Sequence, residues 1–176
     1  MAQPVVVVQQ VGVAARPGLY WVPPVGVPMP WATGICDCFQ GIPTCMDGWC
    51  CCWCALASQY NMVTTGLKGM NLPVCAGTAC LDCLFAGGLA EMCLTLYMRN
   101  QIRTRYNIEG TIVVDCLTAF FCGPCAIAQQ TKEMAAWVHY PGGVCSTTPP
   151  LVPLRGAALA TQVMQVAQAQ VMQAQQ

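Results

Sequence analysis

The chain has 176 residues, enough for one domain with tails, and only 8% of its residues are charged. Ordinary soluble domains carry about 25% charged residues. Because 56% of this chain is hydrophobic, we expect lipid or another protein to cover much of its surface. Seven basic and seven acidic side chains give a formal net charge of zero. These are too few cations to neutralise a nucleic-acid backbone, so no nucleic-acid partner is expected.

The composition divides the chain into three parts. Residues 1–30 are rich in Pro, Val and Gln and predict a flexible or polyproline-like arm, because proline fixes φ and lacks an amide donor. Residues 31–140 form the predicted cysteine-rich domain. Residues 141–176 are predicted to be a linker followed by an Ala/Gln-rich tail, either frayed or an oligomerising helix.

Within the domain, the pattern predicts a mainly α fold built on two apolar helices. Residues 31–54 alternate aromatics and cysteines with turn residues, so short strands or irregular loops are expected there. A helix is expected to begin after this cysteine cluster, and residues 64–78, which contain three glycines and a proline, predict a connector.

The first long apolar helix is predicted over residues 79–106, with an interruption at Gly87 and Gly88. The second covers residues 112–135, contains a Cys122-Gly123-Pro124-Cys125 break, and is expected to end before Pro141. A membrane span needs about 20 apolar residues, and acids interrupt both segments. A membrane hairpin that is re-entrant, interfacial or buried within an oligomer therefore fits better than two clean spans.

Three acids lie within these apolar helices: Asp82, Glu91 and Asp115. Intramembrane acids are candidates for ion handling. The alternative is that each caps a helix or pairs with Arg99, Arg103 or Arg105, which follow at the end of the first helix.

Fifteen cysteines are the second outstanding feature. The N-terminus lacks the basic region of a signal peptide, so we do not infer secretion. In a reducing compartment, dense cysteines favour metal binding, lipidation or catalysis over structural disulfides. Three pairs at two-residue spacing are candidate ligands for zinc or another thiophilic metal: Cys51 and Cys54, Cys80 and Cys83, and Cys122 and Cys125. The alternative is that many cysteines are small buried hydrophobic residues.

Catalysis has little support in the sequence. Cys122-Gly123-Pro124-Cys125 matches the redox tetrapeptide of thioredoxin, but the alternating strand–helix pattern of that fold is missing. The single histidine, His139, follows a predicted helix and fits a capping or surface role better than that of a general base. We therefore predict a protein that is not an enzyme, with a thiol oxidoreductase as the remaining alternative.

Two blocks of the sequence resemble a known family. The first runs from Cys50 through Trp53 and Cys54 to Asn61. The second includes Arg99-Asn100-Gln101-Ile102-Arg103, Tyr106-Asn107-Ile108-Glu109-Gly110 and Cys122-Gly123-Pro124-Cys125-Ala126. Together with Trp31-Ala32-Thr33-Gly34-Ile35-Cys36-Asp37-Cys38, they resemble the placenta-specific-8 family over about residues 31–136. This family includes onzin, cornifelin, plant cadmium-resistance proteins and plant cell-number regulators. One departure is Cys52-Trp53-Cys54, where the family usually has Cys-Pro-Cys.

The resemblance implies a cysteine-rich, often membrane-associated protein without a shared catalytic activity. We therefore expect a non-enzymatic protein at a membrane, the plasma membrane in the first instance, acting in metal or ion handling or growth regulation. Its expected partners are membrane lipid and further copies of itself. The alternative is a structural or assembly subunit of a larger complex.

Overall fold

The computed structural model describes residues 28–85 and 87–155 and confirms the mainly α class. Seven helices follow one another in the described residues: the 3₁₀ helix η1 (Ile35–Gln40), α1 (Ile42–Cys50), α2 (Cys52–Thr65), α3 (Leu72–Phe85), α4 (Leu89–Arg105), α5 (Ile112–Phe121) and α6 (Gly123–Ala136). Within residues 28–85 and 87–155 the only extended pairing is a parallel bridge between Met29 and Ile108.

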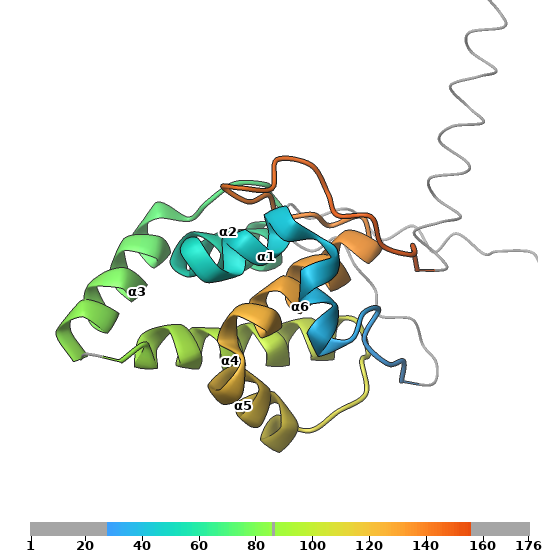
Figure 1. Cartoon of the computed structure of the whole chain (residues 1–176), viewed down its shortest axis with the longest axis horizontal. Coiled ribbons are helices and arrows are strands. Elements are labelled where there is room, and N and C mark those ends of the chain that lie inside the picture. Colours follow the sequence, from blue (N-terminus) through green and yellow to red (C-terminus); the bar gives the residue numbers. More distant parts are fainter. Residues whose placement is uncertain (1–27, 86, 156–176) are drawn as a thin grey trace, which may run out of the picture.

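Helix α6 lies at the centre of the fold. It contacts η1, α1, α2, α4 and α5, and Figure 1 shows it between α1 and α2 on one side and α4 on the other. Every residue from Cys125 to Ala136 is buried. The main core packs α6 against α2 and α4, with Leu56, Met98 and Ile127 among its fully enclosed side chains.

The expected strands or loops over residues 31–54 are wrong, because η1, α1 and the start of α2 occupy this segment. Gly41 ends η1 and precedes α1, where Pro43 takes the first turn, a position that suits its fixed φ and missing N–H. The turn residues therefore separate short helices and not strands. The predicted connector over 64–78 is also too long, since α3 already begins at Leu72.

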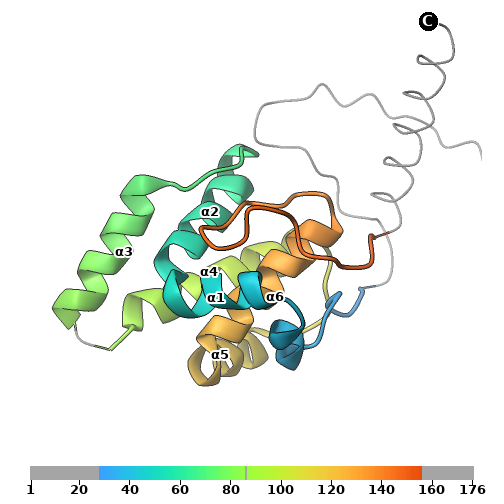
Figure 2. The ribbon, with the colours of Figure 1, turned by 45° about the horizontal axis from the view of Figure 1, so that its top comes forward.

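The first apolar helix is two helices, α3 and α4. Gly87 and Gly88 both have positive φ, +144° and +70°, and in this region glycine is favoured because other residues meet steric strain. The chain therefore turns back, and α3 and α4 form a hairpin that projects from the helical core (Figures 1 and 2). The second apolar segment divides likewise at Cys122 into α5 and α6.

No helix in the described parts of the chain combines the length and the apolar character needed to cross a bilayer.

The segment after α6 returns across the core. The backbone N–H groups of Cys145 and Ser146 donate to the buried carboxylate of Asp47 on α1. Arg155 pairs with Glu133 of α6 at 3.1 Å. Two buried acids thus hold this loop against helices that lie far from it in the sequence. Residues 1–27 of the predicted arm and residues 156–176, the Ala/Gln-rich tail, lie outside the described residues.

Candidate functional site

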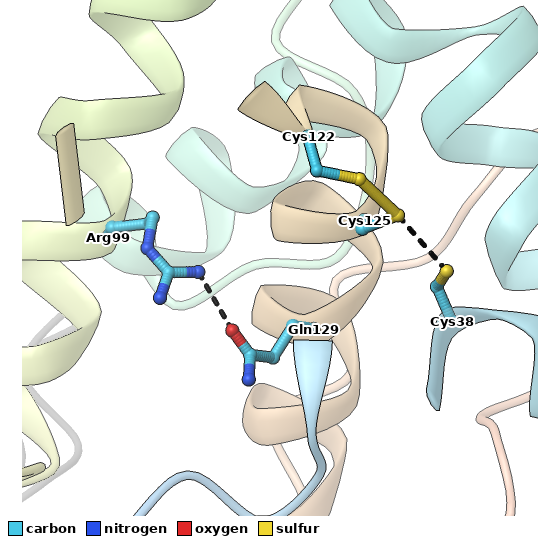
Figure 3. Close-up of a disulfide and its surroundings, with 5 residues drawn as sticks. All are labelled: Cys38, Arg99, Cys122, Cys125 and Gln129. Atoms are coloured by element: carbon cyan, nitrogen blue, oxygen red, sulfur yellow. Dashed lines mark hydrogen bonds between the residues drawn. A yellow bond between two sulfur atoms is a disulfide. The ribbon is translucent and has the colours of Figure 1, made fainter. Parts of the chain in front are cut away.

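Four cysteines gather between η1, α1 and the start of α6. Cys38, Cys45 and Cys125 are 2%, 8% and 5% exposed and form a small core cluster with Ala128, against which Cys122 packs. Cys122 and Cys125 are joined by a disulfide, and the Sγ of Cys38 lies 3.2 Å from the Sγ of Cys125 (Figure 3). Cys45 is the third sulfur of this buried cluster. We call these four residues the sulfur cluster.

The helix ends explain why the sulfurs meet. Cys122 is the N-cap of α6, and Pro124 occupies its first turn. Cys122 and Cys125 are three residues apart, so their side chains lie on the same side of this turn. Gly48 lets α1 approach closely, because a Cβ at this position would lie 2.6 Å from the carbonyl oxygen of Pro124. This close approach brings Cys45 of α1 to the start of α6.

A buried lysine lies beside the sulfur cluster. Lys132, one of the α6 side chains, is 3% exposed, and its Nζ donates to the backbone carbonyl of Asp37 at 2.5 Å. Within residues 28–85 and 87–155 it forms no salt bridge. Burial raises the pKa of the Cys38 thiol most, Cys45 raises it further, and the charge of Lys132 acts in the opposite direction. The ammonium therefore acts electrostatically on the sulfur cluster.

The structure brings together only one of the predicted cysteine pairs, Cys122 with Cys125. Cys54 contacts a residue outside the predicted set, Cys75, with their sulfurs 3.3 Å apart. Cys80 and Cys83 are exposed on α3. No group of three or more His, Cys, Asp or Glu side chains in the described residues is placed so that it could hold a metal ion.

Sequence reasoning did not place Cys38 and Cys45 in a site. The proximity of Cys36 and Cys38 to the other pairs was visible in the sequence. Cys45 carries no spacing signal, since its neighbours in the sulfur cluster are 77 or more positions further along the chain or in a different helix.

The three acids of the apolar helices have internal partners. Asp82 accepts hydrogen bonds from the Trp53 indole at 2.8 Å and from the backbone N–H of Ala90 at 2.8 Å, in the first turn of α4. It therefore ties α3 to the beginning of α4, as a helix-capping acid does. Asp115 is 2% exposed and accepts from Arg99 at 3.2 Å and Arg103 at 2.8 Å. Asp82 thus caps a helix and Asp115 pairs with arginines, the two alternatives that the sequence offered to a role in ion handling.

Arg99 connects three parts of the fold. Besides Asp115, its guanidinium donates to the Gln129 side chain at 2.9 Å (Figure 3). Its Cζ also lies 4.4 Å from the centroid of the Trp31 ring, a cation–π contact. This buried ion pair joins α4, α5 and α6 with the segment that precedes η1.

Glu91 lies in a groove between the α3–α4 turn and the α5–α6 junction. The groove has a volume of about 340 Å³ and is lined by Gly87, Gly88, Leu89, Glu91, Met92, Ala119, Phe120, Gly123 and Pro124. Burial raises the pKa of Glu91, while a hydrogen bond from the Cys52 thiol opposes this increase. The groove also shows that the tip of the α3–α4 hairpin lies next to the end of α5.

Large exposed hydrophobic side chains lie on the helices that border this groove. They are between 47% and 78% exposed and lie on the second half of α3, the first residue of α4 and α5: Leu81, Leu84, Phe85, Leu89, Ile112, Val113, Val114, Leu117, Phe120 and Phe121. We call this set the apolar face. The α3–α4 turn and α5 lie along the same lower edge in Figures 1 and 2.

The apolar face carries no exposed charge. Helices α3 and α5 contain one charged residue each, Asp82 and Asp115, and both are buried. In the whole described part of the chain, Lys68 and Glu109 are the only charged residues that are exposed. Charge is therefore scarcer on the surface than in the sequence, because the fold buries or half-buries the other charged residues of the described part.

Comparison with known proteins identifies the family. The model of the PLAC8 family matches residues 31–133. The chain belongs to the PLAC8 family. This confirms the resemblance found in the sequence, including both motif blocks.

Individual relatives are similar at about 30% identity. Protein PLANT CADMIUM RESISTANCE 1 of Arabidopsis thaliana is 32% identical over 107 residues, which are 59% of this chain and 66% of that protein. Cell number regulator 4 of Zea mays is 29% identical over 115 residues, covering 64% and 69% of the two chains. Placenta-specific gene 8 protein of Pongo abelii is 31% identical over 134 residues, covering 74% and 88%. The match thus spans slightly less than two thirds of the Arabidopsis protein, and no solved structure matches the chain.

Proposed function

We propose that this PLAC8-family protein acts at a membrane surface, where it docks on the bilayer through the apolar face. The single observation that carries the proposal is the composition of this face, which has ten exposed large hydrophobic side chains and no exposed charge. Monomeric soluble proteins rarely expose contiguous apolar patches beyond a few hundred Å². Helices that lie in the membrane interface bury such a surface among headgroups and acyl chains.

The proposed docking is hydrophobic and not electrostatic. Arg99 and Lys132 are internal, and Arg103 is engaged with Asp115. The exposed Lys68 and Glu109 have opposite charges. Since anionic lipids attract clustered Lys and Arg, this protein should bind zwitterionic vesicles about as well as anionic ones, with little dependence on salt.

At the membrane, we propose a non-enzymatic role in metal handling or growth regulation. The printed names of the relatives support these two fields, cadmium resistance in Arabidopsis thaliana and cell number regulation in Zea mays. Self-association is part of the proposal, because copies that sit side by side on a bilayer would cover each other's remaining apolar side chains, such as Trp49 and Met46 of α1.

Vesicle flotation tests the docking. The full chain is mixed with phosphatidylcholine vesicles, with or without phosphatidylserine, and centrifuged in a density gradient at low and high salt. The double variant Phe85→Asp/Phe121→Asp removes side chains that are 69% and 78% exposed. Burying each Phe is worth about 1.5–3 kcal/mol, so we expect the variant to lose at least about tenfold in partitioning.

The matched control is Leu67→Asp, which changes a side chain that is 66% exposed on the α2–α3 connector. This connector lies at the opposite edge of the molecule from α5 (Figure 1). The control should float like the wild type. If the wild type stays in the bottom fraction with both lipid mixtures, the docking proposal is wrong. A stable heteromeric complex that buries Phe85 and Phe121 would then favour the assembly subunit.

A further inference from the structure

We infer that the sulfur cluster is a metal site that opens on reduction, in which Cys38, Cys45, Cys122 and Cys125 bind one thiophilic divalent cation. The inference rests on the metal-handling part of the proposed function and is independent of membrane docking. It names four ligands where the sequence pattern offered three separate pairs.

The first argument is the convergence of the sulfurs. Zinc sites with four cysteines are tetrahedral, with Zn–S distances of about 2.3 Å, which places neighbouring sulfurs about 3.8 Å apart. The Sγ atoms of Cys38 and Cys125 are 3.2 Å apart, and Cys45 belongs to the same buried cluster. Once the Cys122–Cys125 bond is broken, the sulfurs of Cys38 and Cys125 need to separate by only about half an ångström to reach the spacing of a tetrahedral site.

The second argument is the counter-charge. A buried ammonium is costly unless an anionic group compensates for it. Lys132 is buried and has no carboxylate partner among the described residues, and its Nζ donates to the backbone carbonyl of Asp37, the residue before Cys38. A divalent cation with four thiolates carries a net charge of −2. Lys132 offsets part of this charge, so an occupied site explains why a lysine is buried at this position.

The third argument is the start of α6. Cys122 is its N-cap and Cys125 lies in its first turn. The N-terminal end of a helix carries a partial positive charge that favours thiolates. A Cys-x-x-Cys pair at a turn is also the usual half of a structural zinc site. Cys80 and Cys83 have the same spacing but lie exposed within α3.

Reduction frees the two sulfurs of the Cys122–Cys125 bond as ligands. A dithiol reductant gives two electrons and two protons to the Cys122–Cys125 bond, which breaks into two thiols while the reductant becomes a disulfide. The cation then binds four sulfurs, and the thiol protons pass to solvent. Oxidation of the same pair removes two ligands, so the site holds its metal only in the reduced chain.

Cobalt spectroscopy tests the site in the full chain. The protein is reduced with a water-soluble phosphine, stripped with a chelator and titrated with Co²⁺ without oxygen. We expect thiolate-to-cobalt charge transfer and strong tetrahedral d–d absorption that saturate at one equivalent, and displacement of Co²⁺ by Zn²⁺ or Cd²⁺. The untreated chain, with Cys122 and Cys125 bonded, should show neither signal.

Variants assign the ligands. Cys38→Ser and Cys45→Ser should each lower the Co²⁺ affinity by more than the roughly 10–100-fold that follows loss of an outer-shell contact. The matched control, Cys80→Ser/Cys83→Ser, removes an exposed pair of the same spacing and should titrate like the wild type. Absence of thiolate-to-cobalt absorption in the reduced wild type would overturn the inference, and so would loss of the signal only in the control.

A measurement on the wild type alone covers the case in which a variant does not fold. The reduced chain is alkylated with and without Cd²⁺, and each cysteine is read by peptide mass spectrometry. Metal should slow alkylation of Cys38, Cys45, Cys122 and Cys125 and leave Cys80 unaffected. Protection that is confined to other cysteines, or that does not occur, contradicts the assignment. The vesicle experiment reports on neither result, so the two proposals fail separately.

Discussion

The Asp115→Asn substitution tests how the core carries its charge. Asp115 is 2% exposed and accepts hydrogen bonds from Arg99 at 3.2 Å and from Arg103 at 2.8 Å. An asparagine has nearly the same shape but brings an uncharged amide whose N–H₂ opposes one of the two donors. Arg99 is 2% exposed, so the substitution leaves a buried guanidinium without its counter-ion.

Breaking a buried pair in this way costs about 3–5 kcal/mol. We therefore expect urea denaturation, followed by circular dichroism, to show a loss of about that size in the unfolding free energy. Glu109→Gln is the matched control because Glu109 is exposed, and it should stay within about 0.5 kcal/mol of the wild type. A loss below about 1 kcal/mol for Asp115→Asn would refute the claim that this ion pair holds α4 and α5 together.

Two further predictions concern stability. Gly48→Ala should destabilise the fold although alanine is the better helix former, because its Cβ would lie 2.6 Å from the Pro124 carbonyl oxygen. Gly77→Ala on α3 is the control: no atom lies within 4 Å of its Cβ, so it should raise the unfolding free energy by about 0.5–1 kcal/mol in the same urea assay. Glu91→Gln should raise the unfolding free energy at pH 8. Burial raises the pKa of Glu91 above 4.5, so the folded state holds this proton more tightly and the wild type loses stability as pH rises through the raised pKa. Equal pH profiles for the two proteins would contradict that reasoning.

The helical segments could be predicted where local signals are strong. The apolar periodicity around Leu94 and Ile127 indicated helices. An arginine partner for Asp115 could be predicted because three arginines lie at the end of the helix that precedes it. The breaks were harder. Gly87 and Gly88 were recognised as an interruption, but a full reversal of the chain depends on Asp82 binding the start of α4, a tertiary contact.

The sulfur cluster shows a different limit. Spacing in the sequence selects pairs that share one turn, such as Cys122 and Cys125, and it also selected Cys80 and Cys83, which the structure leaves exposed. Cys38 and Cys45 reach Cys125 only because η1 and α1 pack on α6. A ligand that comes from another helix has no signature in one sequence.

The sequence predicts that an apolar surface exists, and the fold determines where it lies. The low content of charged residues predicted a surface that needs a cover, but not its place. The place depends on which charges the fold takes inside, and burial of Asp82 and Asp115 leaves α3 and α5 without any at the surface.

Insertion depth of Phe121 tests the central claim most directly. Phe121→Trp places a fluorophore on the apolar face, and Leu67→Trp places one on the connector at the opposite edge. Each variant is measured against the wild type with vesicles of phosphatidylcholine brominated along the acyl chains, which quench only nearby indoles. The account predicts that the added emission is quenched for Phe121→Trp and persists for Leu67→Trp. Equal emission from both variants, with or without bromine, would contradict it.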